Sequence, residues 1–283
     1  GCRGHLGKEL ISEFNLDAGK DPQHYGIGIK ELWDIDPANH QEGLVLHGTG
    51  WPLTESGSTG GFFLYHAENN QVVVGLITDL SYSNPHVSPF DEFQRMKHHP
   101  VLKKSLEGGK RVSYGARAIT KGGLNCLPKM TFPGGLVIGC DAGTLNFAKI
   151  KGTHTAMKSG MIAAEAVFEA ISNQSVIANY HKHFKQSWLY EELYQARNFS
   201  SGIHRFGSWL GGSLAMLEHN VLKGKAKWNV RCDSAAHQSL LLAEKSHQIS
   251  YPKPDGVLSF DRLSSVYLSN IFHEEDQPCH LRL

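Results

Sequence analysis

The sequence predicts an α+β protein in which a mainly antiparallel sheet is followed by a helical region. Between residues 25 and 120, apolar and polar residues alternate in runs separated by short turns, which is typical of antiparallel strands. Beyond residue 133 the pattern changes to a short apolar segment and a long alanine-rich stretch, which indicate a strand and a helix. With 283 residues, 40% of them hydrophobic, the chain can form one large domain or two smaller ones.

Composition excludes several functional classes. The 28 Lys and Arg residues balance 27 Asp and Glu residues, so the net charge of +1 gives no basic field, and we expect no nucleic-acid partner. No apolar run reaches the roughly 18–20 residues that a spanning helix needs. Neither the histidine pairs nor the cysteines have metal-ligand spacing, and we expect no metal site and reduced thiols at Cys2, Cys126, Cys140, Cys232 and Cys279.

In the first 120 residues, strands dominate. Apolar spacing predicts a helix over His5–Phe14. Alternation predicts four strands, the last two joined as a hairpin by Ala67–Asn70: Tyr25–Trp33, Gly43–Trp51, Gly61–His66 and Gln71–Ile77. A cap and Pro89 then begin a helix over Ser88–Lys97, followed by a helical turn at Val101–Leu106 and a strand at Val112–Ala118.

The second part of the chain is mostly helical. An apolar strand is expected over Pro133–Cys140 and a helix over Thr153–Ile171. The small and apolar residues of that helix predict a packing face of Ala156, Met157, Gly160, Ala163, Ala164, Val167 and Phe168. Further helices are expected over residues 180–197 and 203–222, and a weakly patterned, extended connector from Lys223 onward.

The clearest chemical pattern is the apolar segment Leu136–Gly143, which is followed after a loop by Lys151–Gly160. A carboxylate after a strand can accept a hydrogen bond from a sugar-alcohol hydroxyl, and glycines let a cofactor approach the backbone. The free N–H groups at the start of the next helix stabilise an anion such as a reduced flavin. The pattern suits a flavin, but an ordinary strand–loop–helix connection with an Asx turn explains it equally well.

Two glycine-rich stretches need separate interpretation. Tyr25–Lys30 resembles the start of a GxGxxG turn, but the alternating surroundings indicate a strand, and no phosphate-cradling turn precedes a helix in this sequence. Gly60-Gly61 precedes an aromatic strand and either admits a flat apolar ring, with Phe62, Phe63 and Tyr65 as its walls, or forms a turn before a core strand. Asn125, after a Gly-Gly pair, either bonds a cofactor edge or holds a turn.

An uncharged segment, Phe206–Leu217, is too short to span a bilayer. It either lies in a membrane interface, with Trp209 at headgroup depth and Lys223, Lys225 and Lys227 facing anionic lipid, or forms a buried helix.

A set of longer motifs carries a family resemblance. They are Gly1–Leu6, Tyr25–Trp33, Gly60-Gly61, Glu92–Pro100, Glu107–Arg111, Lys149–Gly160, Tyr251–Gly256 and His273–Pro278. Together they resemble the electron-transfer flavoprotein:ubiquinone oxidoreductase family nearly from end to end, most weakly over Phe199–Gln248.

The resemblance implies a glutathione-reductase-like FAD-binding fold with an inserted antiparallel quinone-binding domain. It implies FAD and a 4Fe-4S cluster as cofactors, and electron-transfer flavoprotein and ubiquinone as partners. It also implies monotopic attachment to a mitochondrial or bacterial inner membrane. By position, Gly60 and Gly61 match quinone-contacting glycines, and the residues that match FAD-binding positions are Asn125, Asp141, Gly143, Gly152, Thr153 and Thr155. No covalent catalytic residue is expected.

The sequence also departs from the family pattern, because the GxGxxG turn and the four cluster cysteines are not found in it. We therefore expect an interior portion of a longer protein. Residues 1–15 and 121–172 would belong to the FAD domain, 16–120 to the quinone domain, 173–222 to a membrane-surface helical region, and 223–283 to a connector. A related FAD-dependent reductase of isoprenoid lipids and an inactive fragment that does not hold FAD are the alternatives.

Overall fold

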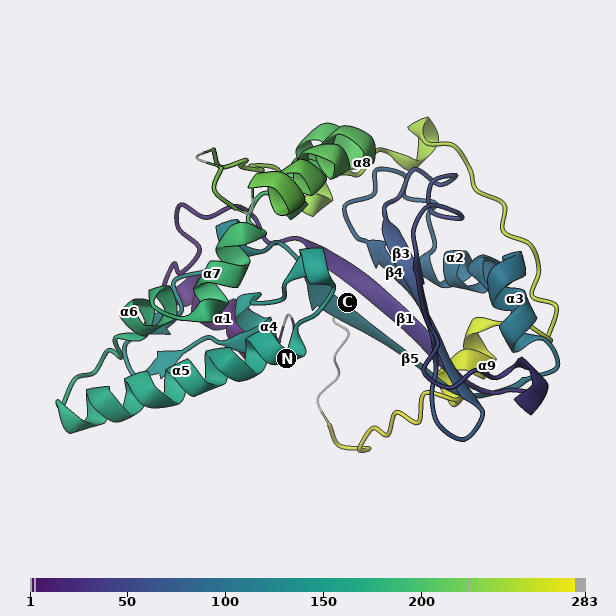
Figure 1. Cartoon of the computed structure of the whole chain (residues 1–283), viewed down its shortest axis with the longest axis horizontal. Coiled ribbons are helices and arrows are strands. Elements are labelled where there is room, and N and C mark those ends of the chain that lie inside the picture. The colour runs from purple at the N-terminus through teal and green to yellow at the C-terminus, as the bar shows by residue number, and fades with distance from the viewer. Residues whose placement is uncertain (1, 3, 223, 227, 278–283) are drawn as a thin grey trace. The chain divides into compact units, whose positions relative to one another are not determined.

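The computed structural model describes residues 2, 4–222, 224–226 and 228–277. The chain forms two compact units, each built from separate stretches of sequence (Figure 1). Unit 1 contains residues 1–27, 79–85 and 118–242, and unit 2 contains residues 28–78, 86–117 and 243–283. The expected α+β class with an antiparallel sheet is confirmed.

A five-stranded sheet has the order β2-β3-β4-β1-β5, and its strands are β1 (Tyr25–Asp34), β2 (Val45–Gly48), β3 (Gly60–His66), β4 (Gln71–Asp79) and β5 (Lys110–Thr120). β3 pairs antiparallel with both β2 and β4, and the predicted hairpin between β3 and β4 is confirmed. β2 is shorter than the predicted Gly43–Trp51, because Gly43 and Gly50 adopt positive φ angles that end the extended backbone on either side.

Two helices of unit 2, α2 (Pro89–Met96) and α3 (Pro100–Leu106), begin within one residue of where the sequence predicts. Ser88 caps α2 by accepting a hydrogen bond from the Asp91 N–H. α9 (Arg262–Tyr267) lies in the C-terminal stretch that was expected to be extended. Buried apolar side chains from the sheet, from α2 and from α3 fill this unit's interior, including Ile29, Trp33, Leu64, Val74, Leu76, Phe93, Met96 and Leu102.

Unit 1 is mostly helical. Its helices are α1 (His5–Glu13), α4 (Gly139–Ala142), α5 (Thr153–Ser172), α6 (Tyr180–Lys185), α7 (Trp188–Gln195) and α8 (Phe199–Leu217). A small hairpin of β6 (Thr131–Phe132) and β7 (Gly135–Leu136) joins them. Their common core consists of Leu16, Leu127, Met130, Val137, Ala142, Ile162, Ala163, Ala166, Tyr180, Phe184, Leu189 and Leu193.

Two predictions for unit 1 were wrong in detail. The apolar strand expected over Pro133–Cys140 is limited to β7, because Gly139 takes a positive φ and begins the short helix α4. The packing face of α5 is also different, since Met157 and Phe168 are 67% and 74% exposed, while Thr155, Ser159, Ile162, Ala163 and Ala166 are buried. The buried face therefore includes two hydroxyl side chains that apolar periodicity does not reveal.

α8 covers most of the helix expected over residues 203–222, but it contains a kink at Gly207, whose φ is +75°. A π-helical turn over residues 218–222 follows. Between residues 224 and 261 the described chain has only short 3-10 turns, as the weak sequence pattern predicts.

Candidate functional site

Asp141 lies in α4 rather than directly after a strand. Its Oδ1 accepts a hydrogen bond of 3.1 Å from the N–H of Gly4, the N-cap residue of α1, which has no side-chain cap of its own. A Cβ on Gly7 would lie 2.2 Å from Asp141 Oδ2, so the carboxylate needs glycine at this position of α1. The carboxylate is thus held at the positive end of α1, where an acceptor is stabilised.

Gly143 ends α4 in the left-handed region, with φ of +95°. A Cβ on Gly143 would lie 2.4 Å from Gln23 Nε2, and Gln23 Oε1 accepts a hydrogen bond from the Gly122 N–H. One glutamine side chain therefore holds Gly122 by a hydrogen bond and lies against Gly143, which the sequence did not indicate.

The N-terminus of α5 follows the loop after α4, the helix that carries Asp141. Gly152 is the N-cap, and no side chain caps the first turn; the Thr155 hydroxyl instead donates to the Gly152 carbonyl at 2.8 Å. The backbone N–H groups of residues 153–155 consequently lack intrahelical partners, as at the start of any helix. Thr155 is fully buried and Thr153 is exposed, so the structure gives the two predicted threonines different surroundings.

Glu192, on α7, fixes the loop that leads into α5. Its carboxylate accepts hydrogen bonds of 2.8 Å from Lys149, Asn146 and His154. Burial raises the pKa of the Glu192 carboxyl, but these hydrogen bonds outweigh burial and lower the pKa to about 2. The loop between α4 and α5 is therefore held by an anion that stays charged at all physiological pH values.

Asn125 lies in a 3-10 turn, Leu124–Cys126. Its amide nitrogen donates to the carbonyls of Arg197 and Val230 and to the side chain of Asn229, at 3.0–3.2 Å. These hydrogen bonds hold the turn that carries Asn125 against residues 197, 229 and 230.

Gly60 and Gly61 begin β3 in unit 2, where they pair with Thr78 and Ile77 of β4. Gly60 has φ of +154°, and a Cβ there would lie 2.0 Å from the Ile77 carbonyl oxygen; a Cβ on Gly61 would lie 2.7 Å from the Gly48 carbonyl oxygen. Backbone packing alone therefore requires glycine at both positions. Glycine at this pair is not in itself evidence for a ligand.

The aromatic residues beside the glycine pair cover glycines of neighbouring strands. A Cβ on Gly48 would lie 2.2 Å from the Phe62 ring, and one on Gly75 would lie 2.4 Å from the Phe63 ring. Phe63 also stacks on Tyr65, with ring centroids 4.8 Å apart. The flat space above these glycines is filled by the protein's own rings.

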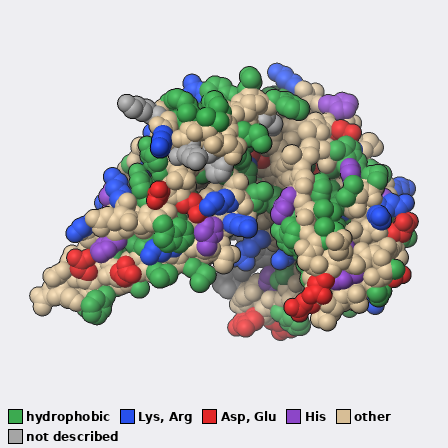
Figure 2. Space-filling view, viewed as in Figure 1, with side chains coloured by type: hydrophobic (Ala, Val, Ile, Leu, Met, Phe, Trp, Pro, Cys, Tyr) green, Lys and Arg blue, Asp and Glu red, His purple; other side chains and the backbone are tan. Residues whose placement is uncertain are grey.

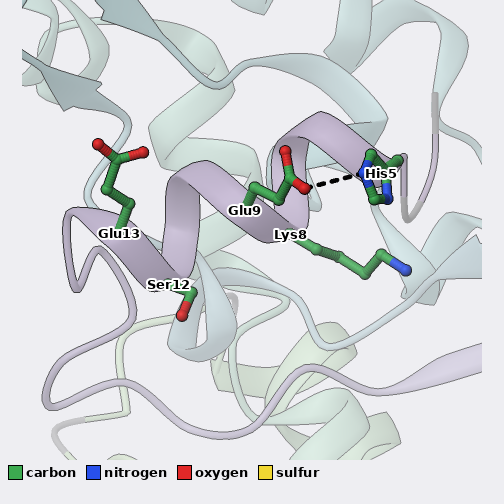
Figure 3. Close-up of a pocket in the computed structure, with 5 residues that line it drawn as sticks. All are labelled: His5, Lys8, Glu9, Ser12 and Glu13. Carbon is green, nitrogen blue, oxygen red and sulfur yellow. Dashed lines mark ion pairs between the residues drawn. The ribbon is translucent and has the colours of Figure 1, made fainter.

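A surface depression on α1 is lined by side chains of one helix only: His5, Lys8, Glu9, Ser12 and Glu13 (Figure 3). His5 and Glu9 point toward each other and form an ion pair of 2.9 Å, while Lys8 extends away from them. All five residues are exposed. The depression has the character of a helix surface rather than of an enclosed site.

Unit 1 contains a buried polar cluster that local sequence patterns do not predict. We call His24, Asp79, Lys121 and His204 the imidazole cluster; His24, Asp79 and Lys121 are 3%, 2% and 4% exposed, and the His204 side chain is 11% exposed. The Lys121 ammonium contacts the Asp79 carboxylate, His204 Nε2 lies 3.4 Å from Asp79 Oδ2, and the two imidazole rings stack with centroids 4.0 Å apart. The sequence gives only a weak signal for this cluster, because Asp79 ends the apolar strand β4 and Lys121 directly follows β5.

Unit 2 contains a second buried cluster, which we call the carboxylate-centred triad: Glu31, Lys97 and Arg111. Lys97 Nζ lies 2.8 Å from Glu31 Oε2 and Arg111 Nη1 lies 3.2 Å from Glu31 Oε1. Three aromatic rings, of Trp33, Phe93 and Phe260, lie 5.1–5.3 Å from the Lys97 ammonium. Burial lowers the pKa of Lys97 to about 8, although Glu31 opposes this shift.

α8 carries exposed apolar side chains. Trp209 is 90% exposed, Leu210 73% and Met216 69%, and Figure 2 shows hydrophobic side chains gathered over this helix at the top of the view. Within the described residues, no helix combines the length and apolar character needed to cross a membrane. Of the lysines predicted to face lipid, Lys225 is exposed, and Lys223 and Lys227 lie outside the described residues.

Four cysteines fall within the described part of the chain, and Cys2, Cys126, Cys140 and Cys232 are all free thiols. In that part, no group of three or more His, Cys, Asp or Glu side chains is arranged to hold a metal ion. Cys279 lies outside the described residues.

Comparison with protein families first defines the class. A family model described as ETF-QO, ubiquinone-binding matches residues 25–119. A second model, described as electron transfer flavoprotein-ubiquinone oxidoreductase, 4Fe-4S, matches residues 256–283. The two matches lie in separate stretches of the chain, and both indicate the same class, a quinone-linked flavoprotein.

Curated relatives then identify the family. The electron transfer flavoprotein-ubiquinone oxidoreductase of Pseudomonas aeruginosa is 62% identical over 100% of this chain and 52% of its own length. The mitochondrial proteins of the same name from Arabidopsis thaliana and Homo sapiens are 48% and 47% identical over 100% of this chain and 45% and 48% of their own lengths. The chain belongs to the electron transfer flavoprotein-ubiquinone oxidoreductase family, and it spans about half the length of these relatives.

Among solved structures, a geranylgeranyl bacteriochlorophyll reductase-like protein from Thermoplasma acidophilum is 14% identical with a TM-score of 0.47, covering 76% of this chain and 51% of that one.

Proposed function

We propose that this chain is part of an FAD-dependent enzyme that transfers electrons from reduced electron-transfer flavoprotein to ubiquinone. The observation that carries the proposal is the 47–62% identity to proteins of that name over the whole chain. Identity at this level does not favour the isoprenoid-lipid reductase as an alternative. The reaction feeds electrons into a respiratory chain and needs no covalent nucleophile.

The residues of unit 1 fit a bound flavin. The uncapped first turn of α5 offers N–H donors, Asp141 offers a fixed carboxylate, and Gly139 and Gly143 leave the two ends of α4 without a side chain. When bound, FAD supplies the ability to accept and release electrons. Asp141 would accept a hydroxyl hydrogen bond, and the N–H groups of Gly152, Thr153 and Thr155 would stabilise negative charge.

The proposal includes a glutathione-reductase-like arrangement of the FAD-binding segments, residues 1–15 and 121–172. It also includes a role for Asn125 beside the flavin.

The quinone domain is proposed over residues 16–120, with the quinone ring near Gly60 and Gly61. The match of residues 25–119 to the ubiquinone-binding family model supports it. Backbone packing already requires glycine at both positions, so these glycines leave no empty space for a ligand. The quinone ring would therefore contact residues that neighbour Gly60 and Gly61 at the start of β3.

The 4Fe-4S cluster is proposed for the full-length protein. The match of residues 256–283 supports its presence, but the described cysteines do not form a four-thiolate set. No step of the reaction is therefore assigned to side chains of this chain at a cluster.

Peripheral attachment to an inner membrane, bacterial or mitochondrial, is proposed through the helical region 173–222. The exposed Trp209, Leu210 and Met216 of α8 support it, because an apolar helix face flanked by lysine suits a lipid interface. Replacing Trp209 with Ser should reduce co-sedimentation of the full-length protein with vesicles of anionic lipid. Unchanged co-sedimentation would remove α8 from the attachment site.

The proposed reaction is tested with the full-length protein that contains these residues. Reduced electron-transfer flavoprotein and a short-chain ubiquinone should give steady quinone reduction, and a geranylgeranyl substrate should not be hydrogenated. No quinone reduction by a protein that contains FAD would contradict the proposal. Reduction of the prenyl double bond would support the alternative.

The role of Asp141 has its own test. Asp141→Ala should release FAD during purification, because the carboxylate that is held by α1 is lost. Asp17→Ala, an exposed carboxylate in the same unit, is the matched control and should retain FAD fully. Full FAD retention by both variants would exclude Asp141 from the cofactor site.

A further inference from the structure

The imidazole cluster contains polar atoms without partners. His24 is 3% exposed, and neither of its ring nitrogens has a hydrogen-bond partner among the described residues. A neutral imidazole has one donor and one acceptor, so two hydrogen-bonding groups are desolvated there without compensation. The buried hydroxyls of Thr144 and Ser200 are in the same condition, and Ser200 lies one helical turn before His204 on α8. A buried polar group without a partner is uncommon in folded proteins, so each of these groups needs a specific explanation.

The surroundings of His204 match a protonated ring better than a neutral one. Ser81 donates its hydroxyl hydrogen to Asp79 Oδ1 at 2.6 Å, so its oxygen is an acceptor toward His204 Nδ1, which lies 3.3 Å away. His204 Nε2 faces the second acceptor, Asp79 Oδ2, at 3.4 Å. A neutral ring can donate to only one of these oxygens, whereas an imidazolium donates to both.

Charge and burial oppose that protonation in the resting protein. The Lys121 ammonium already contacts the Asp79 carboxylate and lies 4.7 Å from the Phe147 ring centroid. Burial lowers the pKa of His204 to about 4, with further lowering by His24 and Lys121 and an opposing effect of Asp79. Burial likewise lowers the pKa of His24. The hydrogen-bond geometry is thus set for a proton that the local charges keep out.

The charged groups around the two rings come from every neighbouring element. They are Asp79 at the end of β4, Lys121 after β5, and Asp21 in the loop before β1, which is paired with Arg231. The two cations balance the two carboxylates. A negative charge added nearby would therefore be the change that favours protonation of an imidazole.

The cluster adjoins the segments proposed to hold the flavin. His24 follows Gln23, whose side chain links Gly122 and Gly143, and Lys121 precedes Gly122 in the stretch that leads to Asn125. Electrons that arrive on the cofactor add the negative charge that the resting cluster lacks.

We propose that the stacked pair of His24 and His204 is a redox-linked proton site, which takes up one proton from solvent when the bound flavin is reduced. The proposal rests on the proposed function. The electrons come from a reduced flavoprotein, the proton comes from water or buffer, and the only bond formed in the cluster is one imidazole N–H. Reoxidation of the flavin removes the added negative charge, and the imidazole then releases the same proton to solvent. His24 and His204 are positioning residues for charge, not groups that touch the reacting atoms.

The test is the slope of the flavin midpoint potential against pH, measured by spectroelectrochemistry on the full-length, FAD-loaded protein between pH 5.5 and 8.5. This slope counts protons taken up per electron, whatever the rate of turnover. The wild-type protein should take up close to one more proton for each full reduction than His204→Gln. The matched control, His183→Gln, removes a partly exposed histidine of the same unit and should keep the wild-type slope.

A second variant keeps the proposal falsifiable if His204→Gln does not fold. His24→Phe preserves the ring stack and removes only nitrogens that have no partners, so it should fold and retain FAD. Its slope should move in the direction of the His204→Gln slope. Equal slopes in the wild-type protein and in the variants that retain FAD would overturn the inference and leave the proposed function intact. A full-length protein that binds no FAD would overturn both.

Discussion

The two buried charge clusters of this protein differ in how completely their polar atoms are satisfied. In the carboxylate-centred triad of unit 2, one carboxylate binds two cations, and the Arg111 guanidinium also donates to Ser265 Oγ at 2.6 Å. In the imidazole cluster of unit 1, the His24 ring has no hydrogen-bond partner among the described residues. The neutral His204 ring faces two acceptor oxygens but has only one N–H to donate. The triad is the better satisfied of the two clusters, although Arg111 Nε is also buried without a hydrogen-bond partner among the described residues. A well-satisfied cluster holds structure, whereas a cluster with several unpaired ionisable groups is a candidate for a change of protonation.

The triad also ties the C-terminal stretch to the sheet. Phe260 lies between the two cations, with the Arg111 guanidinium 3.9 Å from its ring centroid, and its N–H donates to Gln94 Oε1 at 2.9 Å. Tyr251 donates to Glu92 Oε1 at 3.0 Å. The later part of the weakly patterned connector is therefore fixed to α2 by partly buried hydrogen bonds.

The largest effect is expected for Glu31→Gln. This change leaves Lys97 and Arg111 buried without their shared anion, and removal of one partner from a buried pair costs about 3–5 kcal/mol. The midpoint of chemical denaturation of unit 2 should fall accordingly. The control is Glu107→Gln, which breaks the exposed pair with Lys103 and should change stability by less than about 1 kcal/mol. Equal losses in both variants would show that the triad is not a special structural element.

A smaller effect is expected from pH, and it belongs to unit 1. The pKa of His204 is about 4 in the folded protein and near 6.5 when unfolded, so the unfolded chain binds more protons between these values. The contribution of the neutral His204 to the free energy of unfolding is therefore fully present above about pH 6.5. About 3 kcal/mol of this contribution is lost as the pH falls toward 4. Denaturation at a series of pH values should show this loss in the wild-type protein and a reduced loss in His204→Gln. A pH dependence that is the same in both proteins would contradict the burial of a neutral imidazole.

The glycine pair Gly60-Gly61 also lies in unit 2, and it tests whether close packing in that unit extends to the backbone of the sheet. Gly60→Ala places a Cβ against the Ile77 carbonyl at a φ that alanine avoids, and the cost should be about 2 kcal/mol or more. Gly115→Ala is the matched control on β5, since no atom lies within 4 Å of its added Cβ, and it should be neutral or slightly stabilising. Thermal denaturation of the two variants measures the difference. If Gly60→Ala is as stable as Gly115→Ala, glycine at position 60 has to be explained by a ligand.

The smallest effect on stability is expected for His24→Phe. Because neither nitrogen of His24 has a partner among the described residues, the change removes no hydrogen bond and should alter the free energy of unfolding by less than about 1 kcal/mol. Denaturation at pH 7.5 provides the measurement. A loss of several kcal/mol would mean that His24 is held by polar contacts, and would remove the difference between the two clusters.

Local patterns predicted the elements well and the sites only in part. The hairpin of β3 and β4 and the start of α2 follow from turn residues and a Ser-Pro cap, which act within a few residues. The buried face of α5 could not be predicted in this way. Ser159 and Thr155 can be buried because they hydrogen-bond to Gly139 and Gly152, and those contacts depend on the neighbouring loop. The contact of Asp141 with α1 joins residues 137 positions apart, and no local rule gives such a pairing.

The imidazole cluster shows the same limit most clearly. Its four members come from four separate stretches of sequence, and each one alone has the spacing of an ordinary strand end or helix residue. Only the three-dimensional arrangement shows that the histidines stack and that Asp79 serves two cationic or ionisable partners. The family resemblance supplied the expected cofactor positions, but it did not indicate this cluster.

The contrast between the two clusters depends most directly on the protonation state of His204. The measurement is a pH titration of ¹⁵N-labelled histidine side chains by NMR in the full-length protein with oxidised flavin, with His204→Gln used to assign the signal. His204 should remain neutral at pH 7 and gain its proton only well below pH 6.5, near pH 4. A His204 that is already protonated at pH 7, or that titrates at the ordinary value of about 6.5, would contradict the account.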